Sequence, residues 1–154
     1  MSSINQVYKT LRQIIPTITG ISGKKELPNP ESLENNNDNL LKDGWGIIVG
    51  DSSPFDSQEL CRTMDEITFS IVITKESFNS IADASKSFNT NDELLQNMSD
   101  IRVRLLDSDK IGIPQYLDMI TYTGSSAIEF VNSDKYNIRA ITINFNFLIT
   151  ENLT

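Results

Sequence analysis

The sequence predicts an α+β fold, in which a mixed or antiparallel sheet with two long strands is covered on one face by helices. The first observation is that apolar and polar side chains alternate through residues 63–76 and again through residues 137–150. Successive side chains of a strand point to opposite faces, so each segment has one apolar face to bury. The second observation is that residues 3–16 and 90–106 repeat apolar side chains at helical spacing. Helices of this kind can cover the apolar face of the sheet.

The length and composition are those of a globular protein. At 154 residues the chain is close to the commonest domain size, so we expect a single domain over residues 1–154. Hydrophobic residues make up 38% and charged residues 22%, which argues against disorder of the whole chain. The sequence contains no apolar run near the roughly 18 residues of a membrane span, and residues 1–10 lack the apolar core of a signal peptide. We therefore expect no membrane partner and a cytoplasmic protein.

The first predicted element is a helix that Ser3 can cap and that Pro16 ends. Its apolar stripe consists of Ile4, Val7, Tyr8, Leu11, Ile14 and Ile15. A short extended piece is expected over residues 16–21.

A long polar stretch, residues 22–43, separates this helix from the strands and includes a run of asparagines at 35–37. Loops of this length are uncommon in compact domains and are usually functional or disordered. A solvated surface loop is one interpretation, but its leucines favour an arm that docks on another surface. We expect this arm to cross to a neighbouring subunit and bury Leu27, Leu33 or both. The leucines of the inter-subunit arm are Leu27, Leu33, Leu40 and Leu41.

The central segment predicts a strand over residues 45–49, a turn over residues 50–56 and a long strand over residues 63–76. Alternation gives the long strand a buried face and a wet face. The buried face consists of Ile67, Phe69, Ile71 and Ile73, and the wet face of Thr68, Ser70 and Thr74. Residues 77–86 are expected to form a short helix or a loop.

The last third of the chain predicts one helix and two strands. The helix begins at Thr90, which forms a capping box with Glu93. The helix face that lies across the sheet consists of Leu94, Leu95, Met98, Ile101, Leu105 and Leu106. A connection that begins at Ile113-Pro114 leads into residues 118–124, and a further strand is expected over 127–132. The final strand, 137–150, matches residues 63–76 in length, and we expect the two to pair as antiparallel neighbours.

The residue types exclude most site chemistry. The chain has no histidine, so it lacks the usual general base and the commonest metal ligand. Its one cysteine, Cys61, cannot form an internal disulfide or a thiolate cluster. Residues 46–50 only superficially resemble a phosphate loop, because Asp51 stands where the Walker pattern requires lysine. The acids Asp107, Asp109 and Asp118 are interpreted as a solvated surface. We therefore predict no catalytic residues, no metal site and no cofactor.

The net charge of −8 is unevenly distributed. Residues 1–25 carry four bases and no acid, whereas the remainder carries 9 bases and 21 acids. A protein that grips DNA needs clustered lysine and arginine, so the body of this chain has the wrong sign. A negative surface suits solubility, and it also suits a pore through which DNA slides without sticking.

Two stretches carry a resemblance to a known family. Residues 39–50 contain Asn-Leu-Leu-Lys-Asp-Gly-Trp-Gly at the start of a strand, and residues 69–76 end a long strand with Ile-Thr-Lys-Glu. With the N-terminal helix before them and a helix and a long strand after them, they resemble the tail terminator or tail completion proteins of long-tailed bacteriophages. The arm at 22–43 and residues 77–89 depart from the family pattern.

The resemblance implies a structural virion protein that is not an enzyme and needs no cofactor. It implies a ring of six copies that caps the head-proximal end of the tail tube and joins it to the head connector. The implied partners are further copies of the chain, the tail tube protein and the head connector or stopper protein, while DNA passes through without specific binding. The implied location is the tail or neck of the virion, after assembly in the host cytoplasm.

In such a ring, acidic side chains are expected on the inner wall, because a basic lining would hold phosphates and stall the DNA. The pore-lining candidates are Asp51, Asp56 and Glu59, which fall on the predicted turn between the first two strands. A turn at this place can project inward.

Two other classes of function stay open. A head-to-tail connector or stopper protein would share this composition but form a larger ring or carry a longer plug loop. An acidic inhibitory binding module that mimics nucleic acid would work as a monomer or dimer. The acids are scattered along the chain instead of forming rows on one helix face, which disfavours this second class.

Overall fold

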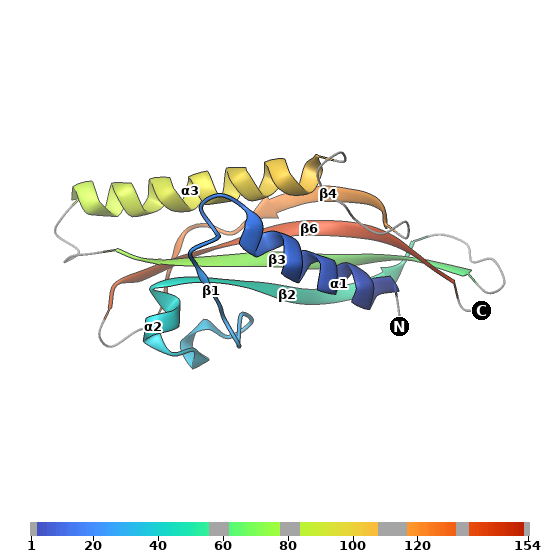
Figure 1. The fold of residues 1–154 in the computed structure, drawn as a ribbon, viewed down its shortest axis with the longest axis horizontal. Coiled ribbons are helices and arrows are strands. Elements are labelled where there is room, and N and C mark those ends of the chain that lie inside the picture. The colour runs from blue at the N-terminus through green and yellow to red at the C-terminus, as the bar shows by residue number, and fades with distance from the viewer. Residues whose placement is uncertain (1–2, 56–61, 78–83, 108–116, 132–135, 153–154) are drawn as a thin grey trace.

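A computed structural model describes residues 3–55, 62–77, 84–107, 117–131 and 136–152. The fold is α+β, as the sequence predicts, and the longer elements follow the expected order (Figure 1). The helices are α1 (Ser3–Ile14), α2 (Asp38–Leu41) and α3 (Ala84–Leu106), with short 3₁₀ turns at Ile15–Thr17 and Leu33–Asn35. The strands are β1 (Lys25–Glu26), β2 (Asp43–Pro54), β3 (Arg62–Glu76), β4 (Leu117–Ser125), β5 (Glu129–Val131) and β6 (Ile138–Asn152).

Within these described residues, six strands form one mixed sheet in the order β1-β2-β3-β6-β4, with β5 pairing with β6 beside this path. Strand β1 runs parallel to β2, and the other pairs are antiparallel. Strands β3 and β6 each have 15 residues and pair over their whole length, from Arg62 opposite Asn152 to Glu76 opposite Ile138. The predicted antiparallel pairing of the two long strands is confirmed.

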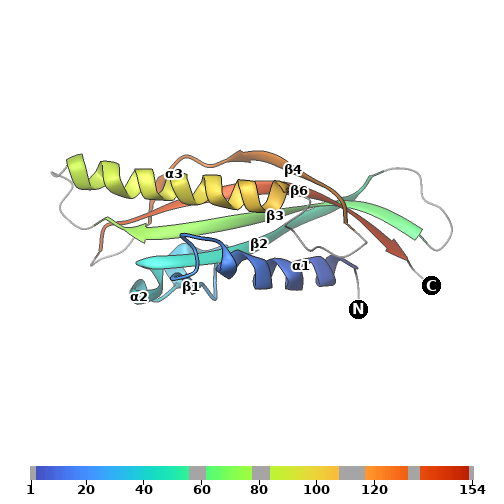
Figure 2. The same ribbon diagram turned by 45° about the horizontal axis from the view of Figure 1, so that its top comes forward.

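Helices α1 and α3 cover the same face of the sheet, as Figures 1 and 2 show. Each helix buries one stripe in the main core, with Val7 and Leu11 from α1 and Leu94 and Ile101 from α3. At the centre lies Phe69, whose ring meets that of Phe147 edge to face at 5.0 Å and stacks with that of Tyr8 at 6.4 Å. The alternation read from the sequence places the apolar side chains of β3 and β6 on this face.

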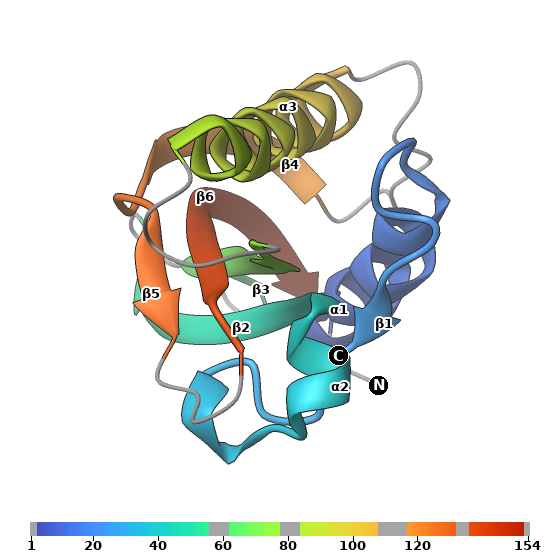
Figure 3. The same cartoon turned by 90° about the vertical axis from the view of Figure 1, so that its left-hand side faces the viewer.

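The opposite face of the sheet is covered only in part. Figure 3 views the sheet along its strands and shows α2 and the segment before it on the side of β2 away from α3. Beneath them, Val72 and Thr74 of β3 have 1% and 0% of their surface exposed. The prediction that this face is wet is therefore wrong at Thr74 and for Ser70, which is also buried, and Thr68 alone of the three predicted residues is half exposed.

Helix α3 begins at Ala84, six residues before the predicted start at Thr90. Residues 90–93 lie inside the helix, where the side chains of Asn91 and Glu93 make tertiary contacts. Asn91 Oδ1 accepts a hydrogen bond from Arg139 at 2.8 Å, and Glu93 Oε1 lies 3.4 Å from Lys75 Nζ. Of the predicted buried face, Leu95 and Leu106 are each 46% exposed, so that part of the prediction is wrong.

Three other expectations also differ from the structure. Residues 16–21 form a 3₁₀ turn and further turns instead of an extended piece, since Ile21 N–H donates to Ile18 O at 2.9 Å. Strand β2 continues through Gly50 to Pro54, across a bulge between Val49 and Ser52. A strand, β4, replaces the connection expected over residues 118–124. Register shifts on both sides of Ile120–Tyr122 interrupt the alternation that would have identified it.

Candidate assembly surface

The leucine-bearing arm, residues 22–43, lies on the sheet of its own chain. Strand β1 pairs with the start of β2, and Leu27 N–H donates to Trp45 O at 2.8 Å. Leu27 is 3% exposed and Leu41 is fully buried. They form a second apolar cluster with Val72, Ile138 and Ala140. This placement corrects the expectation that Leu27 must cross to a neighbouring subunit to leave water, whereas Leu33 and Leu40 are only partly buried.

Two glycines of β2 allow the arm to lie this close. A Cβ atom at Gly44 would be 2.7 Å from Leu27 Cδ2 and 2.7 Å from Leu40 O. A Cβ atom at Gly46 would be 2.5 Å from Pro30 Cβ. A Cβ atom cannot approach another carbon or a carbonyl oxygen this closely, so a side chain at either position would push the arm away. The Gly-Trp-Gly sequence at the start of β2 is therefore explained by the packing of the arm.

Asn36 organises the middle of the arm, and the sequence reading did not single it out. Its amide nitrogen donates to Asn29 O at 2.8 Å and to Leu33 O at 3.0 Å, and its Oδ1 accepts from Asn29 N–H at 2.9 Å. The residue is 7% exposed. Because these bonds satisfy the buried backbone of the loop, the arm has a defined shape. Asn36 is one of three consecutive asparagines, and no periodicity in the sequence distinguishes it from the other two.

An ion network joins the arm to both layers of the fold. Lys24 Nζ lies 2.6 Å from Asp43 Oδ1 and donates to Thr74 O at 3.0 Å. Lys75 Nζ lies 3.9 Å from the same Asp43 oxygen and 3.4 Å from Glu93 of α3. The Lys24 side chain is 1% exposed, and this burial lowers its pKa, while the hydrogen bond with Asp43 opposes the shift. A buried cation held on two sides fixes the start of the arm at the edge of the sheet.

The second face of the sheet also carries a ladder of polar side chains, which are half-buried except for the buried Ser70. Thr68 Oγ1 donates to Asn146 Oδ1 at 2.9 Å, and Ser70 Oγ donates to Asn144 Oδ1 at 2.6 Å. Asn146 Nδ2 in turn donates to Glu66 Oε1 at 3.1 Å. We call Glu66, Thr68, Ser70, Asn144 and Asn146 the polar ladder. Cross-strand polar pairs of this kind stabilise a sheet face that water or a polar partner can reach.

Of the three pore-lining candidates, the structure places one. Asp51 is exposed and lies on β2, which continues where a turn was predicted. Asp56 and Glu59 lie outside the described residues. The structure does not bring the three acids together at a described site.

Strand β4 on one side of the sheet, and the part of β2 beyond β1 on the other side, have open outer edges. Among the described residues, no strand pairs with the outer edge of β4, or with that of β2 beyond Trp45. An open edge presents unpaired N–H and C=O groups that a further strand can bind. Bulges in β4 and Pro54 at the end of β2 make both edges less regular.

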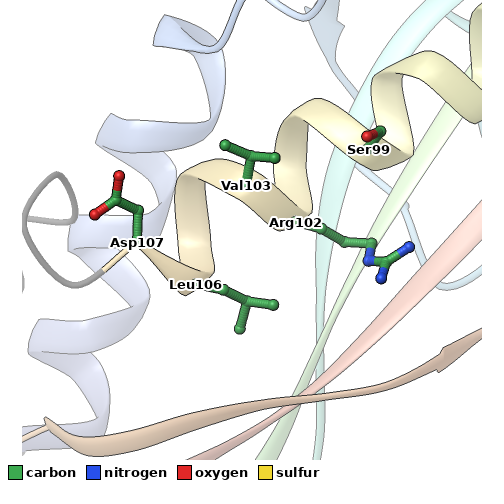
Figure 4. Close-up of a pocket in the computed structure, with 5 residues that line it drawn as sticks. All are labelled: Ser99, Arg102, Val103, Leu106 and Asp107. Atoms are coloured by element: carbon green, nitrogen blue, oxygen red, sulfur yellow. The ribbon is translucent and has the colours of Figure 1, made fainter.

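A groove lies along the C-terminal part of α3 (Figure 4). It measures about 400 Å³ and is lined by Ser99, Arg102, Val103, Leu106 and Asp107. The Arg102 guanidinium lies 4.3 Å from the centre of the Tyr122 ring on β4. Val103 and Leu106 are 61% and 46% exposed, so the groove has an open apolar part beside the polar side chains of Ser99, Arg102 and Asp107. We call these five lining residues the α3 groove.

In the part of the chain that the structure describes, no group of three or more histidine, cysteine or acidic residues could hold a metal ion. Over the same residues, no helix has the length and apolar character needed to span a membrane. The features that remain are surfaces: the arm, the polar ladder, the open edges and the α3 groove.

No protein-family model and no curated protein matches the chain. Among solved structures, the chain is similar to one described as "Virion of native gene transfer agent (GTA) particle". The two share 12% sequence identity over 95% of this chain and 92% of the other, with a TM-score of 0.42. Because the TM-score is below 0.5, this likeness carries no functional weight.

Proposed function

We propose that the chain is a structural virion protein that caps the head-proximal end of a phage tail tube as a homo-hexameric ring and joins it to the head connector. One observation carries this proposal. The two stretches that resemble tail terminators, residues 39–50 and 69–76, pair with each other in the sheet, from Asp43 opposite Lys75 to Val49 opposite Phe69. Chance similarity in two separate stretches would not require them to be hydrogen-bonded neighbours.

The surfaces of the chain are consistent with self-assembly. The open part of the β2 edge and the open β4 edge lie on opposite sides of the sheet, so a contact between these two patches joins two copies head to tail. Head-to-tail contacts generate a ring when the rotation between copies closes. The whole chain acts as one unit in this proposal, and Leu33 and Leu40 are the arm leucines left to contact a neighbour.

The proposed partners are the tail tube protein on one side of the ring and the head connector or stopper protein on the other. DNA passes through the ring without specific binding, which agrees with the excess of acids beyond residue 25. The proposed location is therefore the tail or neck of the virion, and the proposed role requires no catalysis.

The mass of the protein in solution tests this proposal. We expect a species of six copies of the 17.3 kDa chain, either alone at high concentration or after mixing with the tail tube protein. Light scattering gives the mass, and electron microscopy of the same sample counts the subunits. A strict monomer under both conditions would refute the ring, and a ring of more than six copies would favour the connector or stopper class.

A further inference from the structure

Helix α3 carries a second apolar stripe, on the side that does not face the sheet. Its members are Phe88, Leu95, Val103 and Leu106, which are 68%, 46%, 61% and 46% exposed. At about 100° per residue, Phe88, Leu95 and Leu106 point within roughly 20° of one another around the helix axis. Figure 3 shows α3 as the outermost element on its side of the sheet, with no described element beyond it. The outer stripe is therefore apolar surface that the fold of the chain leaves uncovered.

Two opposite charges lie beside the outer stripe, one in each half of the helix. Asp92 is exposed and lies one turn after Phe88, whereas Arg102 is half-buried and lies one turn before Leu106. Neither makes an ion pair with the described residues of its own chain. The Arg102 guanidinium is held 4.3 Å from the centre of the Tyr122 ring on β4, which keeps it near the stripe. The stripe thus has an acidic first half and a basic second half.

The other charged side chains described on and next to α3 point elsewhere. At about 100° per residue, Glu93, Asp100 and Arg104 point at least about 120° away from the outer stripe. Asp107 also lines the α3 groove, but Figure 4 shows its carboxylate pointing away from Arg102, and it already has another interaction. The charge pattern of the stripe is therefore set by Asp92 and Arg102.

A second copy of α3, running antiparallel, is complementary to this pattern. In one register, Phe88 of each copy lies opposite Leu106 of the other. The same register places Asp92 opposite Arg102, because both pairs have their midpoint at residue 97. A two-fold axis repeats each contact, so apolar side chains meet apolar ones and acid meets base at both ends. A parallel pair would instead bring like charges together and align the helix dipoles, which disfavours it.

We infer that a second copy of the chain docks on the outer stripe, with the two α3 helices antiparallel and with Asp92 of each copy facing Arg102 of the other. The contact extends over about 27 Å of helix, from Phe88 to Leu106. Asp107 then lies near the first turn of the second helix, where the helix dipole favours a negative charge. A contact of this size is smaller than a permanent interface, so we expect dimers in the micromolar range.

This dimer goes beyond the proposed ring. A two-fold contact turns the second copy over, whereas the subunits of a ring that are joined head to tail all point the same way. The dimer is therefore a separate state of the free protein, and it uses α3 instead of the open edges of β2 and β4.

Cysteine variants test the register directly. In a Cys61→Ser background, Phe88→Cys and Leu106→Cys are made as two separate chains. We expect disulfide-linked dimers when the two chains are mixed under mild oxidation, and little cross-linking in either chain alone. The reason is that two copies of the same cysteine lie about 27 Å apart in the antiparallel pair, too far for a disulfide. Self-cross-linking of Phe88→Cys, or a mixture that cross-links no more than its components, would overturn the inference.

Charge reversal provides a second measurement. Asp92→Arg should weaken dimerisation at least about tenfold, because arginine then faces arginine at both ends. Adding Arg102→Asp to this variant should restore the dimer. Asp51→Arg is the matched control, since it makes the same change of charge at an exposed acid on β2. A double variant that does not recover, or a control that weakens the dimer as much as Asp92→Arg, would overturn the inference.

Sedimentation of the chain alone, from micromolar to millimolar concentration, gives the mass for these comparisons. The wild type should rise from 17.3 kDa to twice this mass. A wild type that stays monomeric over the whole range would overturn the inference. The tail tube protein is absent from these samples, so a hexamer that forms only after it is added would still support the proposed function.

Discussion

Replacing Leu41 with alanine should destabilise the isolated subunit, because the arm is part of the core of its own chain. Leu41 is fully buried, in a cluster with Leu27, Val72, Ile138 and Ala140. Truncating a buried leucine costs about 2–5 kcal/mol, the transfer of its methyl groups plus the cavity left behind. Partly buried side chains pack against the cluster and can move into the cavity, so we expect a loss of about 2–3 kcal/mol in the free energy of unfolding.

The neighbouring leucine gives a matched control. Leu40 belongs to the same helix, α2, but is only partly buried. Leu40→Ala should therefore cost about 1 kcal/mol or less. The difference between two adjacent leucines separates the effect of burial from any effect on helix propensity.

Urea unfolding measures this difference. Trp45 is the one tryptophan of the chain and is 3% exposed, so its fluorescence reports the loss of the core around β2. At an m-value of about 2 kcal/mol/M, a loss of about 3 kcal/mol moves the midpoint down by about 1.5 M urea. The shift should be the same at two protein concentrations tenfold apart, because the contact lies within one chain.

The opposite pattern would refute this reasoning. If Leu41→Ala unfolds like the wild type when monomeric but assembles less well, the arm packs on a neighbouring subunit, as the leucines alone had suggested. A shift that grows on dilution would point to the same conclusion, since the buried contact would then be between chains.

Two further predictions concern the arm and the pore. Gly46→Ala should lower the free energy of unfolding by about 1–3 kcal/mol, because its Cβ would lie 2.5 Å from Pro30 Cβ. Gly23→Ala is the control and should cost much less, because no atom lies within 4 Å of its Cβ. Equal losses in the two variants, measured by urea unfolding, would contradict the close packing of the arm. Changing Asp51, Asp56 and Glu59 together to lysine should leave the ring intact but slow DNA ejection, and added salt should weaken the slowing because it screens charge. Ejection rates that stay unchanged at low ionic strength would show that these residues do not face the DNA.

Much of the fold followed from the sequence because its longest elements are strictly periodic. Strands β3 and β6 carry apolar side chains at every second position from Ile67 to Ile73 and from Ile141 to Ile149, so their core-facing side and their antiparallel pairing could be predicted. The stripe of α1 was equally clear. Strand β4 was missed since two register shifts break its alternation, and the end of β2 was missed because Gly50 and Pro54 are typical of turns.

The surfaces were harder to predict, because a side chain stays available to a partner only if no other part of the chain packs against it. Four leucines identified the arm, but no local pattern shows whether a leucine contacts its own sheet or another subunit. The deciding residues were Gly44 and Gly46, whose missing side chains make room for the arm. The α3 groove could not be predicted either. In the sequence, Leu95 and Leu106 fit the same helical stripe as Leu94 and Leu105, and only the structure shows that the first pair is exposed and the second pair is buried.

The arm packs against the core of its own chain and also offers surface to a neighbouring copy, so experiments on assembly must separate these two roles. Residues 28–37 include Asn36, which holds the loop together, and Leu33, which packs against the second cluster. Deleting them would uncover Val72 and Ile138 on the sheet as well as remove surface from the arm. Poor assembly of such a truncated chain would then follow from loss of core packing alone. Substitutions at side chains that are exposed or half-buried, such as Leu106 in the groove and Leu40 on the arm, change the surface while leaving the buried clusters in place, and they are the ones that separate assembly from folding.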